Sequence, residues 1–161
     1  MPNFFDASAL VKRYLNEPKS EAVKKFWDNS TTKYTSTFCY YEALSILKGK
    51  RKLQIDPLSQ AEYLKAAFDL TAWYCASKQR IIELDFTDRE TYDLVNKLSE
   101  KTGLDLSDAF QIVCIKSGCF SKLIGNSSPL LITADRELGD VARSEGVRVW
   151  KVLDEDAPFA L

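Results

Sequence analysis

The chain of 161 residues contains no histidine. This absence excludes a Ser-His-Asp triad, a Cys-His pair and a ribonuclease that uses histidine as its acid and base. Cysteine is sparse as well: four occur, and none belongs to a Cys-x-x-Cys pair of the kind found in zinc sites. We expect Cys39, Cys75 and Cys114, which stand in apolar surroundings, to be buried thiols. If the protein is a hydrolase, carboxylates, lysines or a metal ion must carry its chemistry.

Long apolar runs and a strong charge of one sign are also missing. No segment approaches the ~20 apolar residues of a membrane-spanning helix, and the first residues lack the pattern of a signal peptide. We therefore expect a cytoplasmic protein that does not bind a membrane. The chain carries 22 basic and 23 acidic residues, so any surface that binds nucleic acid must be local. The length and the hydrophobic content of 45% predict one globular domain over residues 1–161.

Short apolar segments alternate along the chain with segments of helical periodicity. We expect a first strand that ends at Asp6, further strands over residues 33–37, 80–84, 130–133 and 147–150, and helices over residues 8–17, 20–28, 38–48, 59–77, 87–102, 107–116 and 137–145. Ser20 and Thr87 are the expected N-caps of two of these helices, and Gly103 the expected C-terminal cap of another. This alternation predicts an α/β fold whose mostly parallel sheet is covered by helices on both faces.

Four acidic residues recur in similar settings. Asp6 and Asp135 each follow an apolar strand and precede a helix, whereas Glu42 and Asp108 lie near the starts of helices. All four can face the carboxyl edge of a parallel sheet, where ligands bind in open α/β folds. Like charges at ~4 Å repel each other by roughly 1–4 kcal/mol, and we expect a cation to offset this repulsion. Mg²⁺ or Mn²⁺ fits because hard cations prefer carboxylate oxygens.

Alternatives to a metal site remain open for each acid. Asp6 and Asp135 are also good helix N-caps, and Asp108 is favourable beside a helix N-terminus. Asp105 can serve as a cap or can replace Asp108 as the ligand. Glu42 stands among apolar residues, which favours a functional role because glutamate is seldom buried without a partner.

Hydroxyl and basic side chains near these acids suggest how a substrate is held. The hydroxyls of Ser8 and Thr133 are suited to hold a water molecule or a phosphate. Candidates for contacts with the phosphate backbone of a nucleic acid are Lys12, Arg13, Lys48, Lys50, Arg51, Lys52 and Arg136. The same charges can instead be solvated or can stabilise a helix C-terminus. The aromatic residues Tyr40, Tyr41, Trp73 and Tyr74 can stack on bases or belong to the core.

The four acids stand in segments that together resemble a known family. Residues 4–12 resemble the opening motif of PIN domains, a hydrophobic strand followed by D-x-S-x-L. Residues 41–44 resemble the family's glutamate motif, residues 106–112 its L-x-D-A motif, and residues 131–138 its T-x-D-x-x-L motif. The order and approximate spacing of all four agree with the PIN-domain toxins of the VapC type. Phe110 and Gln111 depart from the pattern, since smaller residues are common there.

The resemblance implies a three-layer α/β/α sandwich and a metal-dependent endoribonuclease that hydrolyses RNA with a metal-activated water. It implies that Asp6, Glu42, Asp108 and Asp135 bind Mg²⁺ or Mn²⁺ and are catalytic. It also implies a homodimer and a cognate antitoxin that blocks the site. The alternative is a catalytically silent PIN-like module that binds RNA or protein. Two other classes fit poorly. A dehalogenase-type site requires aspartate where Ser8 stands, and a dinucleotide-binding fold requires a glycine-rich first turn.

Overall fold

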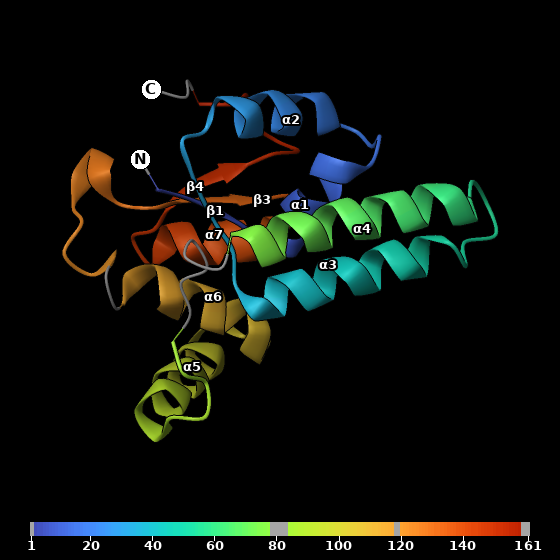
Figure 1. Cartoon of the computed structure of the whole chain (residues 1–161). Helices are drawn as coiled ribbons and strands as arrows, with labels where there is room; N and C mark the ends of the chain where they lie inside the picture. The colour runs from blue at the N-terminus through green and yellow to red at the C-terminus, as the bar shows by residue number, and fades with distance from the viewer. Residues whose placement is uncertain (1, 78–83, 118–119, 159–161) are drawn as a thin grey trace.

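A four-stranded sheet lies at the centre of the computed structural model, which describes residues 2–77, 84–117 and 120–158 (Figure 1). Its strands are β1 (Pro2–Phe5), β2 (Thr32–Tyr34), β3 (Leu130–Thr133) and β4 (Arg148–Lys151). They are ordered β2-β1-β3-β4, and every neighbouring pair is parallel. The structure thus confirms the predicted parallel sheet. Of the strand predicted at 80–84, residues 80–83 lie outside the described residues, and Leu84 belongs to no strand.

The helices agree with the predicted ones to within a few residues at each end. They are α1 (Ala7–Tyr14), α2 (Ser20–Asn29), α3 (Thr37–Lys50), α4 (Gln60–Ala76), α5 (Arg89–Thr102), α6 (Leu106–Lys116) and α7 (Arg136–Ser144), with a short 3₁₀ helix, η3 (Gly125–Ser127). None of the helices in the described part of the chain combines the length and apolar character that a membrane crossing needs.

Two predicted caps were wrong. Ser20 is the first residue of α2, and Lys19 is the N-cap. The Ser20 hydroxyl accepts a hydrogen bond at 2.9 Å from the backbone N–H of Glu17, three residues before the helix. Asp88, rather than Thr87, caps α5, because its carboxylate accepts a hydrogen bond from the backbone N–H of Thr91. Gly103 ends α5 as predicted, with a φ of +80° that glycine adopts without a steric penalty.

The two faces of the sheet are covered by different helices. Phe5, Ile132 and Trp150 are aligned across β1, β3 and β4, and aromatic rings of α2 contact two of them. Trp27 lies 4.6 Å from Phe5 and Phe26 lies 5.0 Å from Trp150, centroid to centroid. Figure 1 shows α2 on this face and α6 and α7 on the other. This arrangement is the predicted three-layer α/β/α sandwich.

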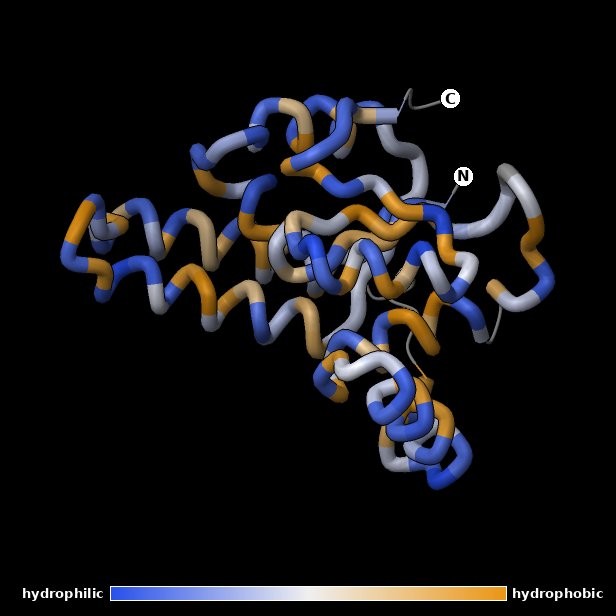
Figure 2. Tube along the Cα trace, turned by 180° about the vertical axis from the view of Figure 1, so that it is seen from behind, coloured by the Kyte–Doolittle hydropathy of each residue, from blue (hydrophilic) through white to orange (hydrophobic). Residues whose placement is uncertain are grey.

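Apolar residues follow the central strands, as Figure 2 shows from behind. Beside the sheet, α3 and α4 form an antiparallel hairpin (Figure 1), in which Tyr40 stacks on Tyr74 at 4.0 Å. The predicted burial of cysteine is confirmed for Cys39 and Cys114 and is wrong for Cys75. Cys75 is exposed because α4 turns other positions, such as Leu70, toward the core.

Candidate active site

Asp6 lies at the carboxyl edge of the sheet, directly after β1. Its backbone N–H donates a hydrogen bond to the carbonyl of Ile132 on β3 at 3.2 Å, and its residue surface is only 3% exposed. The carboxylate caps α1 by accepting a hydrogen bond from the backbone N–H of Ser8. It also accepts hydrogen bonds from the hydroxyls of Ser8, at 3.0 Å, and of Thr133. The sequence-predicted hydroxyls therefore both contact Asp6.

Ser8 and Thr133 also connect the ends of β1 and β3. The Ser8 hydroxyl accepts a hydrogen bond from the backbone N–H of Ala134 at 2.7 Å, and the Thr133 hydroxyl accepts one from the backbone N–H of Asp135 at 2.9 Å. Both hydroxyls are thus held by backbone groups on one side and by Asp6 on the other. This network fixes the position of the Asp6 carboxylate relative to the start of α7.

Asp135 and Asp105 cap the two other helices that begin at this site. The Asp135 carboxylate accepts a hydrogen bond from the backbone N–H of Leu138 at 3.0 Å at the start of α7. The Asp105 carboxylate accepts one from the backbone N–H of Asp108 at 2.9 Å at the start of α6. That bond, together with those from Ser107, outweighs burial and lowers the pKa of Asp105. Both acids are exposed.

Asp108 and Glu42 lie within α6 and α3 and cap no helix. Burial is the main cause that raises the pKa of Asp108 to about 7, followed by the negative charges of Asp105, Asp6, Glu42 and Asp135. The pKa of Glu42 is also raised, first by partial burial of its carboxylate and then by Asp6, Asp105 and Asp135. Glu42 as a whole residue is nevertheless exposed, so the apolar residues beside it in the sequence do not enclose it. These mutual effects place all five acids in one electrostatic neighbourhood.

The same causes act on Asp6. Burial raises the pKa of this carboxyl group from 3.8 to about 6. Hydrogen bonds from Thr133 and Ser8 oppose this rise, and the charge of Asp135 adds to it. A neighbourhood in which several carboxylates resist ionisation favours a positive charge.

Carboxylate oxygens are the donors that a hard divalent cation such as Mg²⁺ or Mn²⁺ prefers. The acids have the right atoms for such a cation, but they are not close enough together to bind it. Across the described ranges, no three acidic or cysteine side chains converge closely enough to hold one metal ion. The donor set therefore fits such a cation in charge and atom type, whereas the side chains in their present rotamers do not form a coordination shell.

Gln111 is a neighbour of the acids that sequence reasoning did not include in the site. It is only 1% exposed, and its Nε2 donates a hydrogen bond to Oδ1 of Asp108 at 3.1 Å. Every other residue from Ala109 to Ile115 is an apolar or cysteine residue, and all are buried. A single amide in this otherwise apolar stretch was the available signal.

The predicted basic residues are mostly engaged elsewhere. Lys12 is buried and donates hydrogen bonds to the carboxylate of Glu17 at 3.3 Å and to the carbonyl of Pro18 at 3.0 Å. Lys50 forms an ion pair with the same Glu17. The structure therefore leaves Lys12 little access to RNA, because the lysine lies inside the helical layer.

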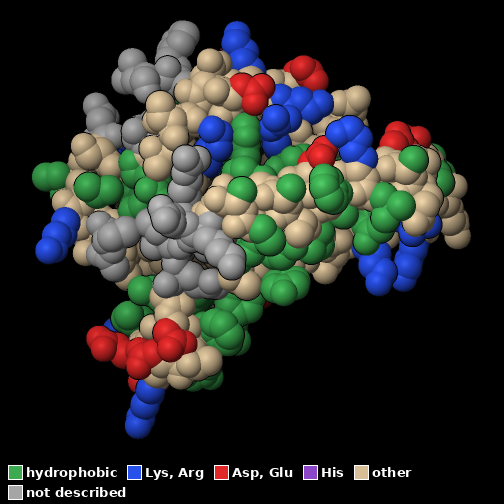
Figure 3. All heavy atoms as spheres, viewed as in Figure 1, with side chains coloured by type: hydrophobic (Ala, Val, Ile, Leu, Met, Phe, Trp, Pro, Cys, Tyr) green, Lys and Arg blue, Asp and Glu red, His purple; other side chains and the backbone are tan. Residues whose placement is uncertain are grey.

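The remaining basic candidates are nearer to solvent. Arg13 pairs with Asp28 at 3.3 Å, and Arg136 pairs with Asp154 at 2.8 Å. Lys48, Arg51 and Lys52 are exposed near the tip of the α3–α4 hairpin. Figure 3 shows Lys and Arg side chains over α2 and the hairpin tip, and acidic side chains over α5. Arg136 follows Asp135 directly at the start of α7, whereas Lys48, Arg51 and Lys52 lie at the far end of α3 from its N-cap.

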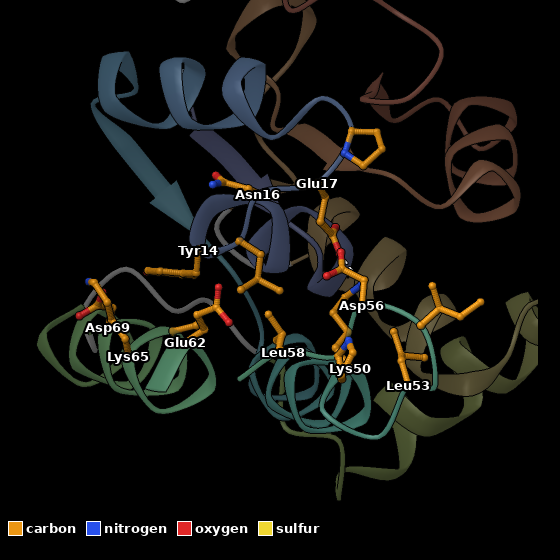
Figure 4. A pocket seen from close by; sticks show the side chains of 15 residues that line it. Tyr14, Asn16, Glu17, Lys50, Leu53, Asp56, Leu58, Glu62, Lys65 and Asp69 are labelled. Carbon is orange, nitrogen blue, oxygen red and sulfur yellow. Dashed lines mark hydrogen bonds and ion pairs between the residues drawn. The ribbon is translucent and has the colours of Figure 1, made fainter. Parts of the chain in front are cut away.

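A hollow of about 620 Å³ lies at the opposite end of α1 from Asp6. Figure 4 shows Glu17 and Lys50 beside Asp56 on one side of this hollow, and Lys65 and Asp69 on the other. An eight-residue helix such as α1 is about 12 Å long, and this length separates the hollow from the acidic edge.

Of the aromatic residues predicted to stack on bases, only Tyr41 is well exposed, at 62%. Tyr40 and Tyr74 stack on each other, and Trp73 contacts Trp27 edge-on. A smaller hollow of about 240 Å³, which the sequence did not reveal, lies against the start of α6. Its lining includes Phe38, Phe86, Tyr92, Leu106 and Phe110.

Comparison with known proteins gives one result that covers most of the chain. No curated protein matches the sequence. The family model described as the PIN domain, however, matches residues 4–144, a span that includes Asp6, Glu42, Asp108 and Asp135. The parallel sheet and its helical layers agree with that match, and the chain therefore belongs to the PIN-domain family.

Proposed function

We propose that the chain is a Mg²⁺- or Mn²⁺-dependent endoribonuclease and the toxin of a toxin–antitoxin pair. One observation carries this proposal: five carboxylates share the carboxyl edge of the sheet, and the pKa values of three of them, Asp6, Glu42 and Asp108, are raised by burial and by neighbouring carboxylates. The nuclease-type fold of the PIN domain supports the same conclusion. The raised pKa values indicate a site that is incomplete without a positive charge.

In this proposal Asp6, Glu42, Asp108 and Asp135 hold the cation. When bound, a divalent ion supplies a means to activate water and to neutralise the charge that develops on a phosphoryl oxygen. Ser8 and Thr133 fix the Asp6 carboxylate through their hydrogen bonds, so that this group does not swing away from its negatively charged neighbours. Glu42 and Asp135 are exposed, so an RNA strand can reach them from solvent.

A second candidate is a binding module without catalytic activity. It is favoured by the finding that, among the described residues, no three acids converge closely enough to hold a metal ion. The two candidates differ in metal affinity. An enzyme binds Mn²⁺ at the acidic edge, with at most a small rearrangement of side chains, whereas a silent module shows no saturable binding there.

The direct experiment is cleavage of a total RNA pool by the purified protein with Mg²⁺, with Mn²⁺ and with chelator. Asp6→Asn removes a charge from the site and keeps the size of the side chain. Asp93→Asn is the matched control, because Asp93 lies on α5 and pairs with Arg89. We expect metal-dependent cutting by the wild type and by Asp93→Asn, and its loss in Asp6→Asn.

Each other outcome is informative. Cutting that survives chelator and Asp6→Asn would show that the acidic edge is not the active site. The absence of cutting, combined with the absence of saturable Mn²⁺ binding, would establish the silent module instead. End mapping of the products tests for the 5′-phosphate and 3′-hydroxyl expected when a water attacks the phosphorus.

The toxin role and the homodimer belong to the same proposal. Leu64 and Phe68, one turn apart on α4, are 53% and 72% exposed, and such an apolar pair on a helix supports a contact between two copies. We expect light scattering to report a dimer, which Phe68→Asp converts to a monomer. Induced expression should arrest growth with the wild type but not with Asp6→Asn.

A further inference from the structure

Four other carboxylates act on Asp108, whose own carboxylate caps no helix. The nearby charges of Asp105, Asp6 and Glu42 all act against it. Rotation of its side chain toward solvent would relieve this repulsion. Another side chain must therefore hold the Asp108 carboxylate toward the other acids.

Gln111 is such a group. It lies three residues after Asp108 on α6, and side chains at this spacing meet on one face of a helix. Its Nε2 donates a hydrogen bond to Oδ1 of Asp108 at 3.1 Å. When Asp108 is ionised, as a bound cation would require, its carboxylate only accepts hydrogen bonds, and the NH₂ group of Gln111 is the donor that meets it. Bonds of this charge-assisted kind are stronger than bonds between neutral groups.

The amide oxygen of Gln111 shows that this position is not optimised for packing. Gln111 Oε1 is buried and finds no hydrogen-bond partner among the described residues. A buried acceptor without a partner destabilises the folded state, and a leucine or methionine would fill the same space in this apolar stretch without that cost. What glutamine provides in return is the bond to Asp108.

We propose that Gln111 is a positioning residue that holds the Asp108 carboxylate in the acidic site. This inference rests on the proposed function for its consequence in catalysis, whereas the bond itself can be tested without it. Groups that orient metal-binding carboxylates typically change metal affinity or activity by 10–100-fold when they are removed.

The bond is tested first by a double-mutant cycle in chelator. Gln111→Leu, Asp108→Ala and the double variant are compared with the wild type by thermal unfolding, because alanine removes the oxygen that accepts from Gln111. If the two side chains interact, the Tm shift of the double variant differs by about 2 °C or more from the sum of the single shifts. Additive shifts would overturn the proposal. This readout requires neither metal nor RNA, so it decides the bond even if the wild type proves inactive, an outcome that would overturn only the proposed function.

The consequence is tested with Mn²⁺ alone and with RNA. We expect Gln111→Leu to raise the Kd for Mn²⁺ and to lower kcat by about 10-fold, with KM within twofold and a Tm equal to or above that of the wild type. Gln111→Glu restores length but not the donor and should not rescue kcat. Ile112→Val is the control, since Ile112 is buried on the same helix: it should lower Tm and leave Mn²⁺ affinity unchanged. Equal losses of Mn²⁺ affinity in Ile112→Val and Gln111→Leu would reveal a merely structural role and refute the assignment.

Discussion

Asp6→Asn should stabilise the metal-free protein at neutral pH, although the same change is expected to abolish RNA cleavage. Asp6 is almost fully buried, and burial raises its pKa from 3.8 to about 6. At about 1.4 kcal/mol per pKa unit, this rise corresponds to about 3 kcal/mol that ionisation of Asp6 removes from folding. Asparagine removes the charge and keeps an oxygen that can accept from the backbone N–H of Ser8, as a good N-cap does.

The sign of the pH dependence follows from the direction of the shift. A carboxyl group whose pKa is raised in the folded state contributes its full stability below its ordinary value of 3.8, and this contribution is lost as the pH rises through about 6. Asparagine does not titrate. The free energy of unfolding of the wild type should therefore drop below that of Asp6→Asn between pH 4 and pH 7, whereas the two values should be similar at pH 4.

The assay is thermal or denaturant unfolding in chelator at pH 4, 6 and 8. After allowance for hydrogen bonds that asparagine makes less well, we expect Asp6→Asn to be more stable by about 2 kcal/mol at pH 8, which raises Tm by about 4–8 °C. Saturating Mn²⁺ should reverse the order by stabilising the wild type alone. A variant less stable than the wild type at pH 8 in chelator, or a difference independent of pH, would refute the reasoning.

Three further predictions concern groups around the site. Glu17→Gln removes the negative charge that pairs with the buried Lys12 and should cost about 1–3 kcal/mol at pH 7 in denaturant unfolding. Burial opposes ionisation of Glu17, but its two lysine partners outweigh burial and lower its pKa below the ordinary value of 4.5, so the cost should be lost as the pH falls through that lowered pKa. Gly103→Ala, at a φ of +80°, should cost about 1 kcal/mol and leave RNA cleavage intact. If Asp105 is only a cap, Asp105→Ala should cost about 1 kcal/mol and Asp105→Asn much less, with Mn²⁺ affinity retained in both; a loss of affinity in both would identify a ligand.

The sequence predicted best where one physical cause dominates. Strand β3 was predicted to the residue because Leu130–Thr133 is buried on both faces and stands between a proline and a helix cap. The start of α1 was predicted late because Asp6 both ends a strand and caps the helix that follows at once. Hydrophobic periodicity does not show that one residue serves both elements, and so it places such a boundary a residue or two away.

The sequence was less informative about where charged side chains point. Lys12 stands two turns from Asp6 along the chain, and proximity alone suggested that it contacts substrate. In the structure α1 is enclosed by α2, α3 and α4, so a lysine at this position meets Glu17 rather than solvent. Tertiary packing decides this outcome, and no local pattern in residues 7–14 encodes it.

The structure also changes which residues carry the inference of a metal. The sequence treated helix caps and metal ligands as competing roles, and it treated clustered acids as unfavourable without a cation. Asp6, Asp105 and Asp135 are all caps, and each gains hydrogen bonds and about 0.3–1 kcal/mol from its helix dipole. These local interactions stabilise the three clustered acids without a metal ion. Glu42 has no such stabilising interaction, because it lies beyond the first turn of α3 and caps no helix. The negative charges of Asp6, Asp105 and Asp135 still act on it. The placement of Glu42, rather than the number of acids, is the stronger reason to expect a cation at this edge.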